Sequence, residues 1–322
     1  MVASEAPGFV QLGHYPAPRH TLVHVSDTHF LAGHAPLYGA VDTDLALGRA
    51  FEQLERSGVR PSGIVITGDL ADLAEPDAYR RLRALIEPAA KRLGAEIIWV
   101  MGNHDERGPF AAELLDEANS GEPLDRVHQL GGLRVVVLDS TVPGFHHGDI
   151  TDEQLDWLRR VLATPAPDGT ILALHHPPLP SPVELMAILE LDNQPQLADV
   201  LRGSDVRAIL AGHLHHSTHG TFAGIPVSVA AATCYTIDVS APRGTLRGID
   251  AAQSVNVVNV YDSGVVHSIV PITDAPQVAG FSDAVLGRLA AMTPEERRAA
   301  FSDKSSTFNV ADADASGGAT AG

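Results

Sequence analysis

The sequence predicts a mixed α/β and α+β fold, a sandwich of two mixed β-sheets with helices on its outer faces. Up to about residue 206, apolar runs typical of strands alternate with amphipathic stretches typical of helices. This alternation places helices over the faces of a sheet. From about residue 207, short strands follow one another with glycine-rich turns and no helices between them, which predicts an antiparallel sheet. Apolar residues make up 44% of the chain, enough for a large buried core.

The first part of the chain supplies strands and helices in turn. The predicted buried strands are Leu22–Val25, Ile64–Thr67, Ile97–Met101, Ile171–Leu174 and Ala208–Ala211, with Val135–Leu138 as a further strand. Leu45–Arg56 and Tyr79–Leu93 place apolar residues three and four apart, as the buried face of a helix does. Asp152–Leu162 is preceded by Thr151 and carries Gln154, the pair that forms a capping box at a helix N-terminus.

The later strands and the two ends of the chain complete the organisation. The predicted antiparallel strands are Gly220–Phe222, Val227–Ala231, Val255–Tyr261 and Val265–Val270. Residues 1–20, with three prolines, are expected to form an irregular arm before a main domain at residues 21–272. Residues 273–301 form a C-terminal extension. Residues 302–322 are small and polar and are predicted to be disordered.

Composition excludes several classes of partner and location. The formal net charge of -18 argues against a nucleic-acid partner, because binding a phosphate backbone requires clustered lysine and arginine. Cys234 is the only cysteine, so an intrachain disulfide is excluded and nothing indicates an oxidising compartment. The N-terminus lacks the pattern of a signal peptide, and no apolar run reaches the roughly 18 residues that span a bilayer. We therefore expect a cytoplasmic protein without a transmembrane segment.

A short polar block follows each of the five buried strands. The blocks are Asp27-Thr28-His29, Gly68-Asp69, Gly102-Asn103-His104-Asp105, His175 in Leu174-His175-His176, and Gly212-His213-Leu214-His215. In an open α/β sheet the carboxyl ends of the strands face one crevice, where ligands bind. We therefore expect the five blocks to meet in space although they are spread along the chain. Their residue types indicate a metal centre.

The side chains in these blocks suit divalent cations. The carboxylate of Asp69 has two oxygens and can bridge two cations, and Gly68 lets the backbone turn sharply before it. Asn103 offers a neutral amide oxygen. His213 and His215 bracket one residue, so in an extended segment both imidazoles face the same way. Taken singly, each of these residues has an ordinary turn, capping, core or surface role as its alternative, and the five blocks in order outweigh that alternative.

In this order the blocks resemble the pattern D-x-H, G-D, G-N-H-[ED], H, G-H-x-H of the calcineurin-like metallophosphoesterase superfamily, over roughly residues 20–272. Within it, the chain is most similar to the actinobacterial class III cyclic nucleotide phosphodiesterases. The closer resemblance lies in His24-Val25-Ser26-Asp27-Thr28-His29, Gly68-Asp69-Leu70-Ala71-Asp72 and Leu174-His175-His176-Pro177-Pro178. It implies a four-layer αββα sandwich, with residues 21–272 as the catalytic domain.

The resemblance also implies two metal ions per chain. One would be held by Asp27, His29, Asp69 and His215, and the other by Asp69, Asn103, His175 and His213. These donors are nitrogen and oxygen without a thiolate, which favours iron, manganese, zinc or cobalt over copper(I), calcium or magnesium. Iron and manganese are the expected pair, with zinc or cobalt as alternatives. Two metals lower the pKa of a shared water and stabilise the charge of an in-line displacement at a phosphodiester.

His104 is the block histidine without a ligand role. Because its neighbour Asn103 is a predicted ligand, His104 should lie at the rim of the site, where it donates a proton to the leaving oxygen as the catalytic residue. The predicted substrate contacts are His29, Asp69, Asn103, His104 and His215.

Several further residues carry weaker expectations. Asp72 and Asp105 are candidates for orienting the ligand histidines, with surface or capping roles as the alternative. His146 and His147 lie in a loop at residues 143–148, for which substrate contact is a secondary hypothesis. Cys234 is expected in the core rather than at the site.

The predicted function is hydrolysis of cyclic nucleotides to nucleoside monophosphates, with 3′,5′-cyclic AMP first and cyclic GMP or 2′,3′-cyclic nucleotides as further substrates. Alternatives are a broader phosphodiesterase or a phosphomonoesterase. Purple acid phosphatases of the superfamily carry G-D-x-x-Y, and Asp72 stands at the tyrosine position here. A non-enzymatic scaffold is disfavoured because all seven ligands are retained, and a nuclease because no basic groove is visible. The resemblance also suggests a homodimer.

Overall fold

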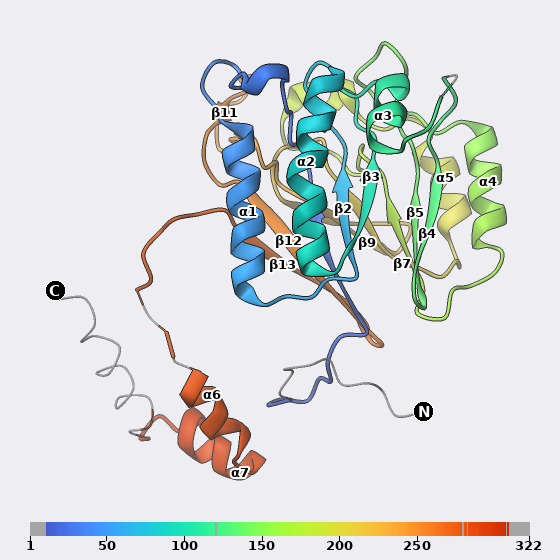
Figure 1. Cartoon of the computed structure of the whole chain (residues 1–322). Helices are drawn as coiled ribbons and strands as arrows, with labels where there is room; N and C mark the ends of the chain where they lie inside the picture. Colours follow the sequence, from blue (N-terminus) through green and yellow to red (C-terminus); the bar gives the residue numbers. More distant parts are fainter. Residues whose placement is uncertain (1–10, 120, 279, 282, 307, 309–322) are drawn as a thin grey trace. The chain divides into compact units, whose positions relative to one another are not determined.

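The computed structural model describes residues 11–119, 121–278, 280–281, 283–306 and 308, and the chain divides into two compact units (Figure 1). One unit is Arg19–Ile272, and the other combines the described residues before Arg19 and after Ile272. The first unit holds every polar block that the sequence predicts to form the site.

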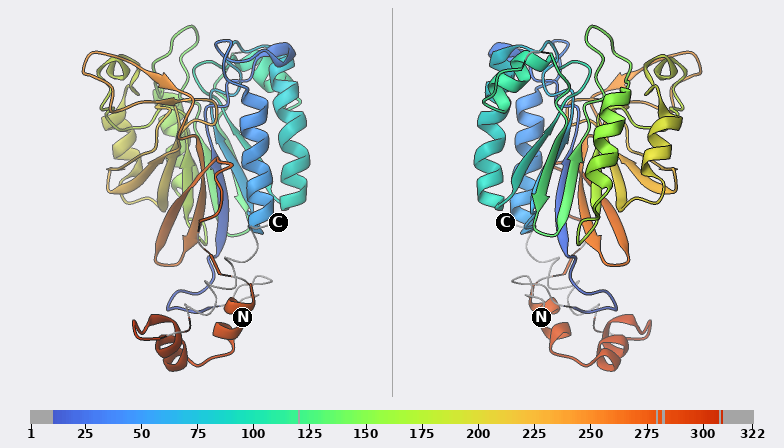
Figure 2. Two further views of the ribbon diagram at one scale, coloured as in Figure 1. Left: turned by 90° about the vertical axis from the view of Figure 1, so that its left-hand side faces the viewer. Right: turned by 90° about the vertical axis from the view of Figure 1, so that its right-hand side faces the viewer.

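A five-stranded sheet ends in the first three polar blocks. Its strands lie in the order β13 (Gly264–Pro271), β12 (Ser254–Tyr261), β1 (His20–Val25), β2 (Gly63–Thr67) and β3 (Glu96–Val100). β1, β2 and β3 are parallel, whereas β12 is antiparallel to both of its neighbours. The outer face is covered by α1 (Thr43–Ser57), α2 (Pro76–Leu93) and α3 (Arg107–Leu114) (Figure 2).

A six-stranded sheet ends in the other two blocks. Its order is β4 (Arg126–Leu130), β5 (Leu133–Val137), β6 (Thr170–Ala173), β7 (Val206–Ala211), β9 (Ile225–Val229) and β8 (Thr218–Phe222). The four central strands are parallel, and the edge strands β4 and β8 are antiparallel to their neighbours. Helices α4 (Asp152–Leu162) and α5 (Gln194–Leu201) pack on its outer face. Short pieces complete the unit: a ribbon of β10 (Thr236–Ile237) and β11 (Gly248–Ile249), and single turns at Ala32–His34 and Glu184–Leu189.

Three apolar clusters hold the layers together. Along β2, Val65 faces the second sheet, while Ile64 and Ile66 face the helices of the first layer. A parallel strand that is buried on both faces needs a continuous apolar run, and for this reason the strand could be predicted from the sequence. A third cluster, including Leu172 and Leu158, joins the second sheet to its helices. The predicted helix–sheet–sheet–helix sandwich of two mixed sheets is confirmed.

Local signals in the sequence placed the helices closely. α4 has the predicted bounds, and its capping box is formed: the N–H of Gln154 donates to Thr151 Oγ1 at 3.3 Å, and the N–H of Thr151 donates to Gln154 Oε1 at 3.1 Å. α1 begins earlier than predicted because Asp42 caps it, accepting the N–H of Leu45 at 2.9 Å. The strand β4 and the helices α3 and α5 were not predicted.

The prediction of one late antiparallel sheet is wrong. The late strands form two separate hairpins, β8–β9 and β12–β13, and each hairpin extends a different sheet. β9 is in fact parallel to β7. Short turns reveal which strands form a hairpin, but they carry no information on which distant strand the hairpin joins, because that is decided by long-range packing.

The second unit contains α6 (Asp283–Ala290), α7 (Pro294–Arg297) and a helical turn at Arg298–Ser302. Residues 11–19 form no helix or strand, in agreement with the irregular arm predicted there. The prediction of a disordered tail at residues 302–322 falls mostly outside the described residues.

Two glycines allow the strand-end segments of the first sheet to touch. Gly68 has φ +86°, a left-handed conformation that side chains rarely adopt. A Cβ at Gly102 would overlap the backbone nitrogen and the carboxylate of Asp69. The blocks after β2 and β3 can therefore be this close only when both positions lack a side chain.

We predict that Gly102→Ala lowers the free energy of unfolding by about 1–3 kcal/mol, because the added methyl group forces the two segments apart. The matched control is Gly48→Ala in α1, where no atom lies within 4 Å of an added Cβ. That change should leave stability unchanged or raise it by up to about 1 kcal/mol through helix propensity. Chemical denaturation of the three proteins tests both expectations, and equal stability of Gly102→Ala and wild type would contradict the close approach.

Candidate metal centre

The five polar blocks meet at the carboxyl ends of the parallel strands, and both sheets contribute. The predicted ligands are Asp27 and His29 after β1, Asp69 after β2, Asn103 after β3, His175 after β6, and His213 and His215 after β7. Asn103 is partly exposed, and the other six are at most 5% exposed. The structure thus brings together every residue that the sequence predicts as a ligand.

Four of these side chains form a first donor set: Asp27, His29, Asp69 and His215. One ligand atom from each lies within 4.8 Å of the others. The Nε2 atoms of His29 and His215 are 3.1 Å apart. His215 Nε2 is also 3.4 Å from Asp27 Oδ1. The set takes three residues from the first sheet and one from the second.

A second donor set surrounds His175. Its Nε2 lies 3.0 Å from Asn103 Oδ1 and 3.4 Å from Asp69 Oδ2. The ring of His213 lies beside it, with 5.0 Å between ring centroids. Asp69 Oδ2 is also 3.5 Å from His29 Nε2 in the first set. One carboxylate oxygen therefore neighbours both donor sets, as a bridging ligand must.

Hydrogen bonds leave one nitrogen of each ligand histidine free to bind a cation. The Nδ1–H of His215 donates to Tyr235 O at 3.1 Å, and the Nδ1–H of His175 donates to Thr67 O at 2.7 Å. His29 Nδ1 pairs with a carboxylate oxygen of Asp72 at 2.9 Å. A carbonyl or carboxylate oxygen only accepts, so in the neutral rings of His29, His175 and His215 Nε2 carries the lone pair. In His213 the roles are reversed, because Nε2–H donates to Leu189 O at 3.0 Å and Nδ1 carries the lone pair. The lone pairs of His29 and His215 then face each other, and a cation bound by both removes their repulsion.

Burial and neighbouring charge shift the protonation of the donors. Burial raises the pKa of Asp27 to about 6, against the attraction of His175 and with the repulsion of Asp69. Burial lowers the pKa of His213 to about 3, and the charge of His175 acts in the same direction. For His175, burial is the largest single effect and opposes the charged form, but the charge and hydrogen bond of Asp69, the charge of Asp27 and the hydrogen bond to Thr67 together raise the pKa to about 9. Metal ligation needs neutral imidazoles and ionised carboxylates, and bound cations would settle this competition for protons in that direction.

The backbone of the ligand segments is strained. Positive φ angles occur at Asp27, His29, Asp69, His213 and His215, between 45° and 71°. Such angles are uncommon outside glycine, and they concentrate at functional sites where the surrounding structure enforces them. The donor sets therefore depend on the fold around them, and their backbone conformation is not a local preference.

His104 and Asp72 lie beside the first donor set. The side chain of His104 is 29% exposed, so a substrate can reach it. Its Nδ1–H donates to Asp72 O at 2.9 Å, and its backbone N–H donates to Asp69 Oδ1 at 2.8 Å. Asp72 orients His29 through the hydrogen bond described above, which is the role that the sequence suggested for it.

Asp105 has a different role from the one that the sequence suggested. Its carboxylate accepts the backbone N–H groups of Leu70, Ala71 and Gly102 and the hydroxyl of Tyr79, at 2.9–3.2 Å. It therefore braces the backbone of the two segments that carry Asp69 and Asn103, rather than orienting a histidine. Burial raises its pKa to about 6, the charge of Asp69 adds to this effect, and the backbone N–H groups oppose it.

Two further histidines support the site. His146 Nδ1 accepts the side-chain N–H of Asn103 at 2.9 Å, which turns the amide oxygen of Asn103 toward His175. His176 is buried and lies against Ser140 Oγ at 2.8 Å, and its Nε2 lies 3.2 Å from His146 O. His147 points elsewhere, with 4.0 Å between its Nε2 and Asp192 Oδ2. The sequence signal for His146 was its place in the 143–148 loop, and His176 gave none beyond its neighbour.

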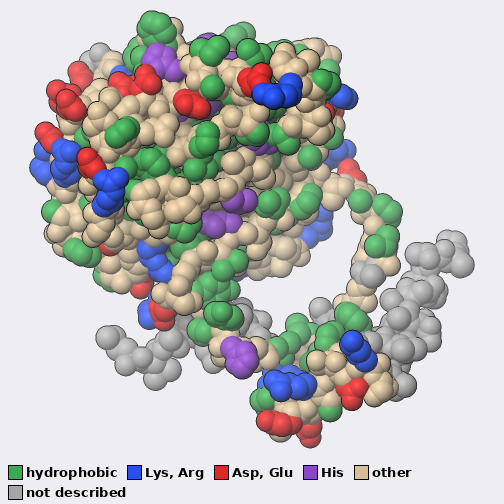
Figure 3. All heavy atoms as spheres, turned by 180° about the vertical axis from the view of Figure 1, so that it is seen from behind, with side chains coloured by type: hydrophobic (Ala, Val, Ile, Leu, Met, Phe, Trp, Pro, Cys, Tyr) green, Lys and Arg blue, Asp and Glu red, His purple; other side chains and the backbone are tan. Residues whose placement is uncertain are grey.

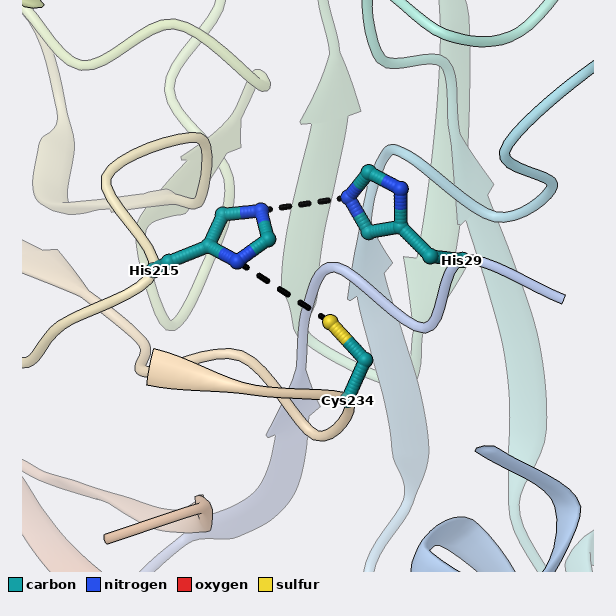
Figure 4. A group of neighbouring side chains, drawn as sticks. All are labelled: His29, His215 and Cys234. Atoms are coloured by element: carbon teal, nitrogen blue, oxygen red, sulfur yellow. Dashed lines mark hydrogen bonds between the residues drawn. The ribbon is translucent and has the colours of Figure 1, made fainter. Parts of the chain in front are cut away.

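Cys234 is buried, as predicted, and it also touches the site. Its Sγ lies 3.9 Å from His215 Nδ1, on the side of the ring away from His29 (Figure 4). Burial raises the pKa of this thiol well above its usual range. The cysteine packs against the predicted ligand His215, and one ligand atom each of His29, His215 and Cys234 lies within 4.8 Å of the others.

Among the described residues, no helix has the length and the apolar character that crossing a membrane requires.

Comparison with known proteins gives relatives and a fold. The chain is 58% identical over 267 residues to a cAMP/cGMP dual specificity phosphodiesterase of Mycobacterium tuberculosis, covering 83% of this chain and 84% of that protein. It is 56% identical over 263 residues to a probable cyclic nucleotide phosphodiesterase of Rhodococcus erythropolis, covering 82% and 87%. A dimetal phosphatase from Danio rerio shares the fold, with a TM-score of 0.58 at 17% identity over 80% of this chain and 97% of that one.

The family model of the calcineurin-like phosphoesterases matches residues 20–217, which include all five polar blocks. Together with relatives above half identity over most of the chain, this match agrees with the two donor sets at the strand ends. The protein therefore belongs to the calcineurin-like phosphoesterase family.

Proposed function

We propose that the protein is a metal-dependent phosphodiesterase that hydrolyses 3′,5′-cyclic AMP to the nucleoside monophosphate, with cyclic GMP and 2′,3′-cyclic nucleotides as further substrates. The observation that carries the proposal is the Asp69 oxygen beside two donor sets, at 3.5 and 3.4 Å from His29 and His175. The relative with 58% identity bears the name of a cAMP/cGMP phosphodiesterase. Assays of purified protein on cyclic AMP, cyclic GMP, 2′,3′-cyclic AMP and a nitrophenyl monoester test the proposal, and activity on the monoester alone would overturn it.

The seven predicted ligands fit two cations. Asp27, His29 and His215 would hold one, Asn103, His175 and His213 the other, with Asp69 shared. When bound, two such cations lower the pKa of a water molecule and offset the negative charge of the phosphate group. The donors are imidazole nitrogen and carboxylate or amide oxygen. These suit iron and manganese, with zinc or cobalt as alternatives.

His104 is the proposed proton donor to the leaving oxygen. Its partial exposure lets it face the substrate, and the hydrogen bond of its Nδ1–H to Asp72 O orients the ring beside the first donor set. The backbone N–H of His104 also holds Asp69 Oδ1, which leaves the other oxygen for the cations. The remaining proposed substrate contacts are His29, Asp69, Asn103 and His215.

Other activities find less support. Asp72 stands where purple acid phosphatases carry a tyrosine, and its carboxylate forms a hydrogen bond with His29. A nuclease needs a basic surface, and the net charge is -18. On the face drawn in Figure 3, lysine and arginine side chains are interspersed with aspartate and glutamate. A non-enzymatic scaffold that binds no metal would not need seven converging donors.

The finer organisation belongs to the same proposal. Residues 21–272 would form the catalytic domain, and residues 273–301 a C-terminal extension. A cytoplasmic location and a homodimer stay predictions, the first from composition and the second from the family resemblance. Sedimentation at working concentration tests the dimer, and a monomer would remove that prediction alone.

We predict that Asp69→Ala lowers the metal content more than Asp27→Ala does, because only Asp69 neighbours both donor sets. Wild type should carry two metals per chain, Asp27→Ala about one, and Asp69→Ala fewer than one. Elemental analysis after gel filtration measures the content, and Asp156→Ala on the exposed face of α4 is the control. Two tightly held metals in Asp69→Ala would rule out the shared role.

We predict that His104→Ala keeps both metals and loses about 10²–10⁴-fold in rate on cyclic AMP, the usual contribution of a positioned proton donor. The loss should be much smaller on bis(4-nitrophenyl) phosphate, because nitrophenolate leaves without a proton whereas a sugar alkoxide does not. Parallel assays of both substrates, with metal analysis of the same samples, measure the difference.

Two other results for His104→Ala have distinct meanings. An equal loss on both substrates, with metals intact, would mean that His104 stabilises the phosphoryl oxygens instead of donating a proton. Loss of a metal would mean that His104 belongs to the ligand set.

A further inference from the structure

A cavity of about 280 Å³ opens beside the proposed phosphate position. Its lining includes Asn103 and His104, which follow β3. The lining also includes residues 72–74 after β2 and residues 141–146 after β5, which form one wall segment each. The cavity volume is close to the lower end of the range of about 300–1,000 Å³ typical of small-molecule sites. A group attached to the phosphate could therefore extend into this space.

The wall at residues 141–146 is held in place before any ligand arrives. Arg107 Nη2 donates to Thr141 O at 3.1 Å, and its Nε donates to buried Asp139 at 3.0 Å. Within the loop, the N–H of Phe145 donates to Val142 O at 2.9 Å. At the far end, His146 is held by Asn103 and His176, as described above. The wall is therefore preformed, which reduces the entropy lost when a ligand binds.

Two large apolar side chains line this cavity while remaining open to solvent. Leu73 is 67% exposed and Phe145 is 61% exposed, and they come from two different segments of the lining. Single exposed apolar side chains are ordinary. Two of them on one cavity, next to the proposed phosphate contacts, form apolar surface where a flat ring can be covered. Exposed Glu106 lines the same cavity, and its carboxylate can accept hydrogen bonds from an amino group of a base.

We propose that this cavity is the nucleobase subsite, with the base stacked on Phe145 and in contact with Leu73. The inference rests on the proposed function and adds to it the residues that recognise the nucleoside. Stacking on an aromatic ring is tolerant of base identity, because every base has a π-face. The subsite thus accepts adenine and guanine alike and holds either base beside His104.

The test compares two substrates that differ only in the base: cyclic AMP, and the same cyclic ribose phosphate with hydrogen in place of adenine. Phe145→Ala should lower kcat/KM on cyclic AMP by about 5- to 100-fold, mainly through KM, since stacking contributes about 1–3 kcal/mol per base. On the base-free substrate the same variant should stay within about twofold of wild type. Leu73→Ala should show the same pattern with a smaller loss. Phe145→Trp should keep the cyclic AMP activity close to that of wild type.

The control is Leu45→Ala, which removes a half-exposed leucine from α1, away from the cavity. It should leave both substrates unaffected. Equal losses on the two substrates for Phe145→Ala would overturn the subsite, because the loop would then serve only to hold the catalytic groups. Unchanged activity on cyclic AMP would overturn it as well. Failure of wild type on both substrates would overturn the proposed function itself, and the subsite with it.

Discussion

The carboxylate of Asp69 is the constraint on which the rest of the site depends. One of its oxygens neighbours histidines of both donor sets, and the other accepts the backbone N–H of His104. Its backbone adopts a positive φ of 50°, and the absence of a side chain at Gly102 makes room for it. Moving this one group would separate the donor sets from each other and the proposed acid from both.

Mostly uncharged partners orient the histidines around Asp69. Through the ring nitrogen that the cations would not use, His175, His213 and His215 each pair with a backbone carbonyl, whereas His29 pairs with the carboxylate of Asp72. A carbonyl fixes the tautomer and the ring direction without adding negative charge to a buried site. This choice keeps the charge of the predicted ligand set low, since only Asp27 and Asp69 carry carboxylates. A positively charged metal pair can then still attract an anionic phosphodiester.

The sequence predicted the parts of this protein that depend on local pattern and strict order. The buried parallel strands were readable because they are apolar throughout, and the capping box of α4 because it needs only Thr151 and Gln154. The five polar blocks could be predicted because each follows a strand, and their assignment as two ligand sets came from the family resemblance. What the sequence missed depends on packing between distant segments. The sheet that each late hairpin joins is one case. The others are the hydrogen bonds of Asp105 to two backbone segments and the hydrogen bond between His146 and Asn103.

Each donor set takes side chains from both sheets, so the ligands exist as a set only while the sheets stay packed together. Cations that bind only the folded chain raise its free energy of unfolding, and the increase grows with the logarithm of their free concentration. The lifetime of the protein in a cell would thereby depend on the supply of the cations that the donor sets bind. A chain made during metal scarcity would open more often and meet proteases more often, so the amount of the protein would follow metal nutrition without any change in its gene's expression.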